Sequence, residues 1–405
     1  MLGSIARGAG AVALGTAAGQ GIVLAATPWL ARQHTPAEFG ALALMMTVSN
    51  IATAAACARY DLALPAAPDK EAAPLLRAAL AATSASAALV LGILAMGAVA
   101  GAGWPAPFDA GWLVALCVLL VGIQQAGIGA ATRERRYDAV GAIRFGQGGL
   151  FALLGSLPGF GLVVAHALSF VVSLPSALRR LASSASSWQE VKTAARERRD
   201  FPLLSLPGAL LDVAGYSACV WIVVHYFGSH DAGQYSQIQR VLGAPLMLVS
   251  MSAGQVLLRA GVDALGNREQ MTALLRRLGL LVAGLGLTLV VGAALFGEPV
   301  LRWLLGPQWR VDAAFIVPVT LAVTVRACVS PLSTLLITLR RFDLSLRWQL
   351  AYFASSVIVL SIAAAHLDLG RFVLVYAIHE LLLYGLYLLL IAKAIRTLPC
   401  AASSA

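Results

Sequence analysis

Residues 278–297 read LGLLVAGLGLTLVVGAALFG, a run of 20 residues without a charged side chain. Arg276 and Arg277 come directly before this run, and Glu298 follows it. Because an α-helix rises about 1.5 Å per residue, the run is long enough to cross the roughly 30 Å hydrocarbon layer of a membrane. It therefore predicts a membrane-spanning helix, and the rest of the chain repeats its pattern.

The composition agrees with a membrane protein. Of the 405 residues, 59% are hydrophobic and only 12% are charged. A water-soluble fold carries roughly 25% charged residues, because its surface must be solvated. The composition excludes a set of soluble domains, and its high hydrophobicity excludes a disordered chain.

Twelve runs of about 20 apolar residues predict twelve spans. The fifth and sixth are the hardest to separate, and Pro158 and Gly159 supply the turn between them. The predicted spans are 8–31, 40–58, 78–101, 110–131, 139–157, 159–178, 204–226, 234–258, 278–297, 313–339, 344–365 and 372–393.

Lysine and arginine are distributed unevenly between the connecting segments. With the N-terminus in the cytoplasm, twenty-one of the 29 basic residues fall in inside segments and four in outside segments. The positive-inside rule therefore predicts that both termini are cytoplasmic. The net charge of +10 is then mostly a topology signal, and we expect no nucleic-acid partner.

A Ser- and Arg-rich segment divides the chain in the middle. It predicts an N-terminal six-helix lobe at 1–178, a cytoplasmic linker at 179–203, a C-terminal six-helix lobe at 204–396 and a short tail at 397–405. A short repeat supports the division, because TPAEFG at 35–40 matches GSHDAG at 228–233. The expected fold is an all-α membrane protein whose lobes are related by a pseudo-two-fold axis along the membrane normal, around a central cavity.

Catalytic and metal-binding motifs are missing from the sequence. The five cysteines are scattered and form no CxxC pair, and neither HExxH, GxSxG nor GxxxxGK[ST] occurs. We expect no metal, no cofactor and no enzymatic activity. A membrane glycan polymerase or acyltransferase is the alternative, but it would carry a sizeable outside loop, and the longest here, 297–312, is short.

Four arginines lie within spans or at their edges, where an uncompensated charge is costly. Arg326 is the deepest, about 20 Å from either end of its span, and Arg240 and Arg144 lie about 9 Å and 8 Å deep. Arg59 ends its span and can also reach the cytoplasmic surface, as can Arg144. We interpret these four residues as candidates for binding substrate in the cavity.

Two glutamines share helical faces with these arginines. Gln237 stands three residues before Arg240, and Gln147 three residues after Arg144. Such groups would line a hydrated, net-cationic cavity suited to an anionic head group, above all a phosphate held by arginine forks.

Two acidic residues also lie within spans. Asp212 is about 12 Å deep and Glu380 about 11 Å deep. Each has two interpretations, coupling of an ion or pairing with an arginine, and the sequence leaves both open.

Six segments resemble those of bacterial polysaccharide-export (Wzx-type) flippases. The segments are TPAEFGALA at 35–43, RYDLALP at 59–65, RDFPLLSLP at 199–207, AGQY at 232–235, RVLGAP at 240–245 and LGPQW at 305–309. Their order and spacing resemble the family along nearly the whole chain. The resemblance implies the multidrug/oligosaccharidyl-lipid/polysaccharide exporter superfamily, with two six-helix lobes around a cavity that opens alternately to each side.

The resemblance also implies a function. The implied substrate is an undecaprenyl-pyrophosphate-linked oligosaccharide, moved from the cytoplasmic to the outer leaflet of the bacterial inner membrane for assembly of lipopolysaccharide O-antigen or exopolysaccharide. Implied partners are membrane lipids, a glycan polymerase and assembly proteins. The runner-up function is a cation-coupled multidrug exporter of the same superfamily. This chain ends soon after its twelfth span, where some relatives carry two more.

Overall fold

The computed structural model describes residues 2–183, 186–264, 267–339 and 341–396. The predicted tail at 397–405 and two residues of the predicted linker, 184 and 185, lie outside the described residues. In the described part of the chain every regular element is helical, and no strand occurs. This is the all-α architecture that the sequence predicts.

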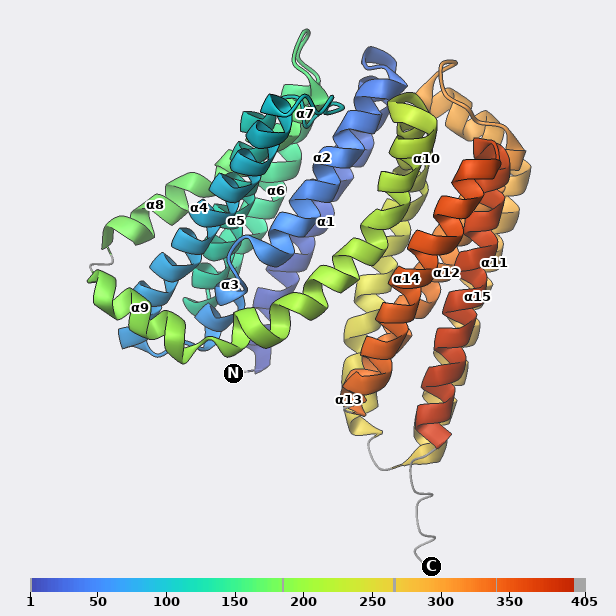
Figure 1. Ribbon diagram of the computed structural model, residues 1–405. Helices are drawn as coiled ribbons and strands as arrows, with labels where there is room; N and C mark the ends of the chain where they lie inside the picture. The colour runs from blue at the N-terminus through green and yellow to red at the C-terminus, as the bar shows by residue number, and fades with distance from the viewer. Residues whose placement is uncertain (1, 184–185, 265–266, 340, 397–405) are drawn as a thin grey trace, which may run out of the picture. The chain divides into compact units, whose positions relative to one another are not determined.

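The chain forms two compact units, Met1–Val220 and Trp221–Ala405 (Figure 1). The division falls inside a helix and later than the predicted linker, so the lobe boundaries stay a prediction. Unit 1 contains α1 (Leu2–Gln33), α2 (Pro36–Ala55), α3 (Tyr60–Ala63), η1 (Leu64–Ala66), α4 (Asp69–Val99), α5 (Gly111–Arg133), α6 (Tyr137–Gly155), α7 (Leu162–Ser169), η2 (Phe170–Ser173), α8 (Leu174–Ser183), α9 (Trp188–Glu197), η3 (Phe201–Ser205) and the start of α10 (Leu206–Asp263).

Unit 2 contains the rest of α10 and the C-terminal helices. These are α11 (Arg268–Leu305), α12 (Ala313–Val329), η4 (Ser330–Ser333), α13 (Thr334–Thr338), α14 (Phe342–His366) and α15 (Leu369–Arg396). Within this unit α12 packs against both α11 and α15, and α14 packs against α15.

Among the described residues, ten helical segments are long and apolar enough to cross a membrane. One of them, α10, contains two of the predicted spans, joined at Gly228, where φ is 83° and the backbone leaves the helical region. The predicted fifth span forms α6, which is helical but does not belong to the ten. The protein is a multi-pass membrane protein, and the count of twelve spans stays a prediction.

Helices α1 and α6 approach so closely that glycines are required between them. A Cβ atom added to Gly15 would lie 2.4 Å from the carbonyl oxygen of Gly141, and one added to Gly148 would lie 2.3 Å from that of Gly19. Gly15 and Gly19 form the small-xxx-small spacing that allows the backbones of membrane helices to meet. This seam fixes the position of α6, and therefore of Arg144, within unit 1.

The two halves of the predicted repeat both contain a break in the helix. Thr35 has extended backbone and caps α2, accepting from the Glu38 amide while the Glu38 carboxylate accepts from the Thr35 amide. The matching position of the second half is Gly228, the break in α10. Asp231, which corresponds to Glu38, instead hydrogen-bonds to His230.

The predicted linker is largely folded onto unit 1. Helix α9 lies across the lower end of this unit in Figure 1 and packs against α4, with Val191 and Ala194 buried. Arg198 pairs with Glu71 at 2.8 Å, and Arg180 pairs with Glu134 at 2.8 Å. Helix α9, the middle of the predicted linker, is therefore folded against unit 1.

The sequence predicts a loop at 297–312, and this prediction is wrong for its first part. Helix α11 continues through Pro299 to Leu305, so only the short stretch up to Asp312 is non-helical. An ion pair between Arg302 and Glu298, one turn apart at 2.8 Å, supports this last part of the helix.

Candidate functional site

Arg326 and Glu380 form a buried ion pair in unit 2. Arg326 projects from α12, and its Nη2 and Nε atoms donate to Glu380 Oε2 on α15 at 3.0 and 3.2 Å. The Glu380 side chain is completely buried, and that of Arg326 is 16% exposed. The sequence left pairing open as an alternative for Glu380, and the structure brings these two residues together.

Tyr352 on α14 completes the pair. Its hydroxyl donates to Glu380 Oε1 at 2.7 Å and accepts from Arg326 Nη2. The guanidinium carbon lies 5.8 Å from the centre of the Tyr352 ring and 6.0 Å from that of Tyr384, which is within the range of cation–π attraction. The charge of Arg326 is therefore compensated by a carboxylate and two aromatic rings.

Sequence reasoning did not single out Tyr352 or its neighbour Trp348. The Trp348 ring stacks on the rings of Tyr387 and Tyr352, with ring centres 4.0 and 5.1 Å apart. Its Nε1 atom donates to the Leu383 carbonyl. The available signal was the four-residue spacing of Trp348 and Tyr352, which places both rings on one face of α14.

Arg144 and Gln147 lie together on α6 in unit 1. Both side chains are half-buried, and their three-residue spacing places them on one face of the helix. No hydrogen bond or ion pair joins the Arg144 side chain to another residue in the described part of the chain. Gln147 Oε1 accepts from Nε2 of Gln124 on α5 at 3.2 Å.

The helices around Arg144 offer it no counter-charge. In unit 1, α6 packs against α1, α5, α7 and η2, and none of these four elements contains Asp or Glu. Arg144 lies about 10 Å along α6 from its first residue, by the helical rise. Within unit 1, Arg144 therefore has no acidic residue in the four described elements that pack against its helix, and the acid of its own helix, Asp138, stands six residues away.

Gln237 and Arg240 lie on α10 in unit 2. Gln237 is buried, and its Oε1 atom has no hydrogen-bond partner among the described residues. Arg240 is half-buried one turn further along the helix. Asp212, near the start of the same helix but in unit 1, has an exposed side chain. The functions of these residues stay predictions.

Arg59 occupies a tight turn between α2 and α3. Its backbone is left-handed, with φ of 65°, as is that of Ala58, with φ of 49°. Such conformations are costly for residues other than glycine and often mark functional sites. The Arg59 Nε atom donates to Ser205 Oγ at 3.3 Å. Burial raises the pKa of the neighbouring Asp61 carboxyl, although the Arg59 charge acts in the opposite direction.

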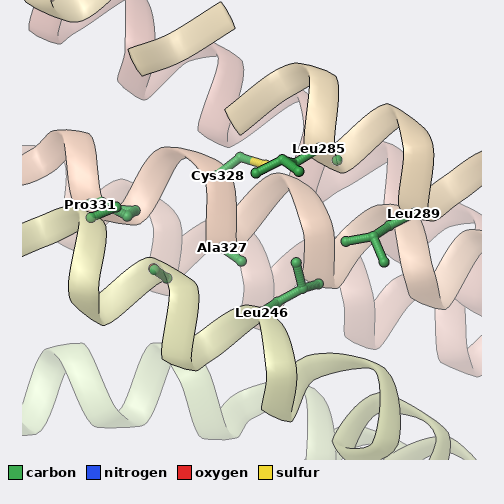
Figure 2. Close-up of a pocket in the computed structure, with 9 residues that line it drawn as sticks. Leu246, Leu285, Leu289, Ala327, Cys328 and Pro331 are labelled. Carbon is green, nitrogen blue, oxygen red and sulfur yellow. The ribbon is translucent and has the colours of Figure 1, made fainter. Parts of the chain in front are cut away.

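A separate cavity of about 90 Å³ in unit 2 has no charged lining. Figure 2 shows Leu246 from α10, Leu285 and Leu289 from α11, and Ala327 and Cys328 from α12 around it. Apolar side chains of this kind suit hydrocarbon and not a charged head group. Sequence reasoning did not predict this cavity.

The described part of the chain is a helical, multi-pass membrane protein with basic side chains inside its helical bundles. Among these residues no group of three or more His, Cys, Asp or Glu side chains could hold a metal ion. The family model described as "Polysaccharide biosynthesis protein" matches residues 29–314. The chain therefore belongs to this polysaccharide biosynthesis protein family.

Several solved structures resemble this chain in fold, and one of them is described as a transporter of the MOP superfamily. The lipid II flippase MurJ in an inward closed conformation is similar with a TM-score of 0.75 and 11% identity, over 94% of this chain and 87% of that chain. An inward-facing multidrug resistance MATE transporter is similar with a TM-score of 0.70 and 15% identity, over 95% of this chain and 96% of that chain. A MATE transporter of Vibrio cholerae has a TM-score of 0.58 and 13% identity, over 97% of each chain. No curated protein matched the sequence.

Proposed function

We propose that this protein is a flippase for undecaprenyl-pyrophosphate-linked oligosaccharides. It moves them from the cytoplasmic to the outer leaflet of the bacterial inner membrane, by alternating access, for assembly of O-antigen or exopolysaccharide. Both termini are cytoplasmic in this proposal. Membership of the polysaccharide biosynthesis family supports the glycan substrate, and the superfamily fold supports a transport mechanism.

The observation that carries the proposal is the difference between two arginines. Arg326 already has a carboxylate partner, whereas Arg144 has none in the described residues or in the helices that pack against α6. An arginine without compensation in a low-dielectric bundle attracts an anion, and its planar fork matches phosphate oxygens. A diphosphate would supply the missing negative charge.

The remaining predicted site residues take two kinds of role in this proposal. Arg240, Gln237 and Arg59 are further contacts for the head group during its passage. Arg326 and Glu380 act as a pair that holds α12 against α15, and Asp212 stays a candidate for ion coupling. A glycan polymerase and assembly proteins act on the product at the outer surface.

A clean deletion of the gene tests the function in cells. We expect a diphosphate-linked oligosaccharide to accumulate on the inner leaflet and surface glycan to disappear. The wild-type gene should restore export, whereas Arg144→Ala should not, although it inserts into the membrane normally. Arg302→Ala is the matched control, because this exposed residue pairs only locally with Glu298.

The rival function is a cation-coupled drug exporter. It predicts that the deletion strain accumulates cationic dyes and retains its surface glycan. Dye efflux lost together with normal surface glycan would contradict the proposed function.

A further inference from the structure

A buried glutamine fixes which side of a neighbouring amide is available to a ligand. Gln124 is completely buried on α5, and its Nε2 atom donates to Gln147 Oε1 at 3.2 Å. The carbonyl side of the Gln147 amide is therefore occupied. Its NH2 group, which carries only donors, remains on the other side of the half-buried side chain.

The Gln124 amide is paired on one side only. In the observed arrangement the Gln124 Oε1 atom is buried without a hydrogen-bond partner in the described part of the chain. The Gln124 amide therefore contacts Gln147 through its nitrogen and not through its oxygen.

We propose that Gln124 is a positioning residue, which turns Gln147 so that Gln147 and Arg144 together form a donor-only subsite for a diphosphate. This inference rests on the proposed function and deepens it. A guanidinium has donors and no acceptor, and the oriented Gln147 amide adds two more donors one helical turn away. Such a set binds oxygen-rich anions and repels cations, so it selects the head group and not the lipid tail.

The neighbouring Gln125 provides a matched control. It is also buried on α5, but its Nε2 atom donates to Thr53 Oγ1 on α2 at 3.5 Å and not to Gln147. Replacing either glutamine by methionine removes one buried amide group, and the methionine side chain has nearly the same volume as the glutamine side chain. Only the Gln124 substitution should release the orientation of Gln147.

The test measures binding of farnesyl diphosphate and of farnesol to the purified full-length protein in detergent. We expect Gln124→Met to lower the affinity for farnesyl diphosphate about tenfold, because one hydrogen bond to a charged ligand is no longer pre-oriented. Affinity for farnesol should not change, and Gln125→Met should bind both lipids as the wild type does. Adding Gln147→Lys to Gln124→Met should restore diphosphate affinity, because an ammonium carries only donors and needs no orientation.

The possible results separate this inference from the proposed function. The inference is overturned when Gln124→Met binds diphosphate normally, or when Gln147→Lys does not rescue a variant whose thermal unfolding is unchanged. Neither result affects the flippase proposal, provided that Arg144→Ala still abolishes diphosphate binding. A wild-type protein that does not distinguish farnesyl diphosphate from farnesol would overturn both.

Discussion

At the scale of single residues, the structure gives different surroundings to two arginines that the sequence placed in the same candidate binding site. Arg326 and Arg144 both stand within predicted spans, but Arg326 contacts Glu380 and Tyr352, whereas the four elements of unit 1 that pack against the helix of Arg144 contain no acidic residue. Helical periodicity predicts the face on which a side chain lies, but not which other helix meets that face. The sequence therefore predicted the polar groups and left their pairing open.

The buried pair gives a prediction for stability. Glu380→Gln should destabilise the protein by about 3–5 kcal/mol, because the Arg326 charge would remain buried without a carboxylate. Replacing both residues by methionine should recover most of this loss, since neither charge is then buried. Thermal unfolding in detergent compares the two variants. If Glu380→Gln is as stable as the wild type, the ion pair does not stabilise the fold.

Asp61 gives a prediction for pH dependence. Its folded-state pKa is raised by burial, so the folded protein binds a proton more tightly than the unfolded chain does. The stability contributed by that proton is present at low pH and is lost as pH rises through the folded-state pKa. Asp61→Asn should therefore raise the unfolding temperature at pH 7.5, and this gain should shrink as pH falls. An Asn variant that is less stable than the wild type at pH 7.5 would argue against this.

At the scale of elements, close helix contacts depend on single glycines. Gly148→Ala should destabilise unit 1 by about 1–3 kcal/mol, because its Cβ would meet the Gly19 backbone at 2.3 Å and one helix must shift. Gly149→Ala is the control, since a Cβ there has nothing within 4 Å. Size-exclusion profiles and thermal unfolding of the two variants should differ, and identical behaviour would mean that α1 and α6 do not meet at this seam.

Hydropathy predicted where the helices lie but not how they end. Each predicted span overlaps a helix, because the apolar runs follow directly from the thickness of the membrane, but several spans extend past a helix end or cover more than one helix. The extension of α11 to Leu305 was missed, since Glu298, Pro299 and Arg302 suggest a loop, although the local Glu298–Arg302 pair supports the helix. The folded α9 was missed because its two buried positions, Val191 and Ala194, give only a short apolar pattern.

At the scale of the whole molecule, the orientation in the membrane rests on the distribution of basic residues. We expect a reporter that fluoresces only in the cytoplasm to be active when fused after Arg396. A periplasmic phosphatase reporter should be active when fused at 306–312. The opposite pattern would contradict the prediction that both termini are cytoplasmic.

The all-helical membrane architecture was predictable because membrane crossing constrains the sequence strongly, whereas the count of twelve spans in two lobes stays a prediction. The chemistry of the site was less predictable, because it depends on contacts between helices that are distant in the sequence. Gln124 and Gln147 meet across two helices, as do Arg326 and Glu380, and no local pattern reports either contact.

Movement of lipid between leaflets tests the central claim most directly. The full-length protein would be reconstituted into vesicles with a fluorescent glycan on a polyprenyl diphosphate, and a membrane-impermeant quencher would report the fraction on the outer leaflet. The account predicts rapid exchange with the wild type and with Arg302→Ala, and none with folded Arg144→Ala. Exchange by Arg144→Ala at the wild-type rate would contradict the claim that an uncompensated arginine in unit 1 carries the diphosphate.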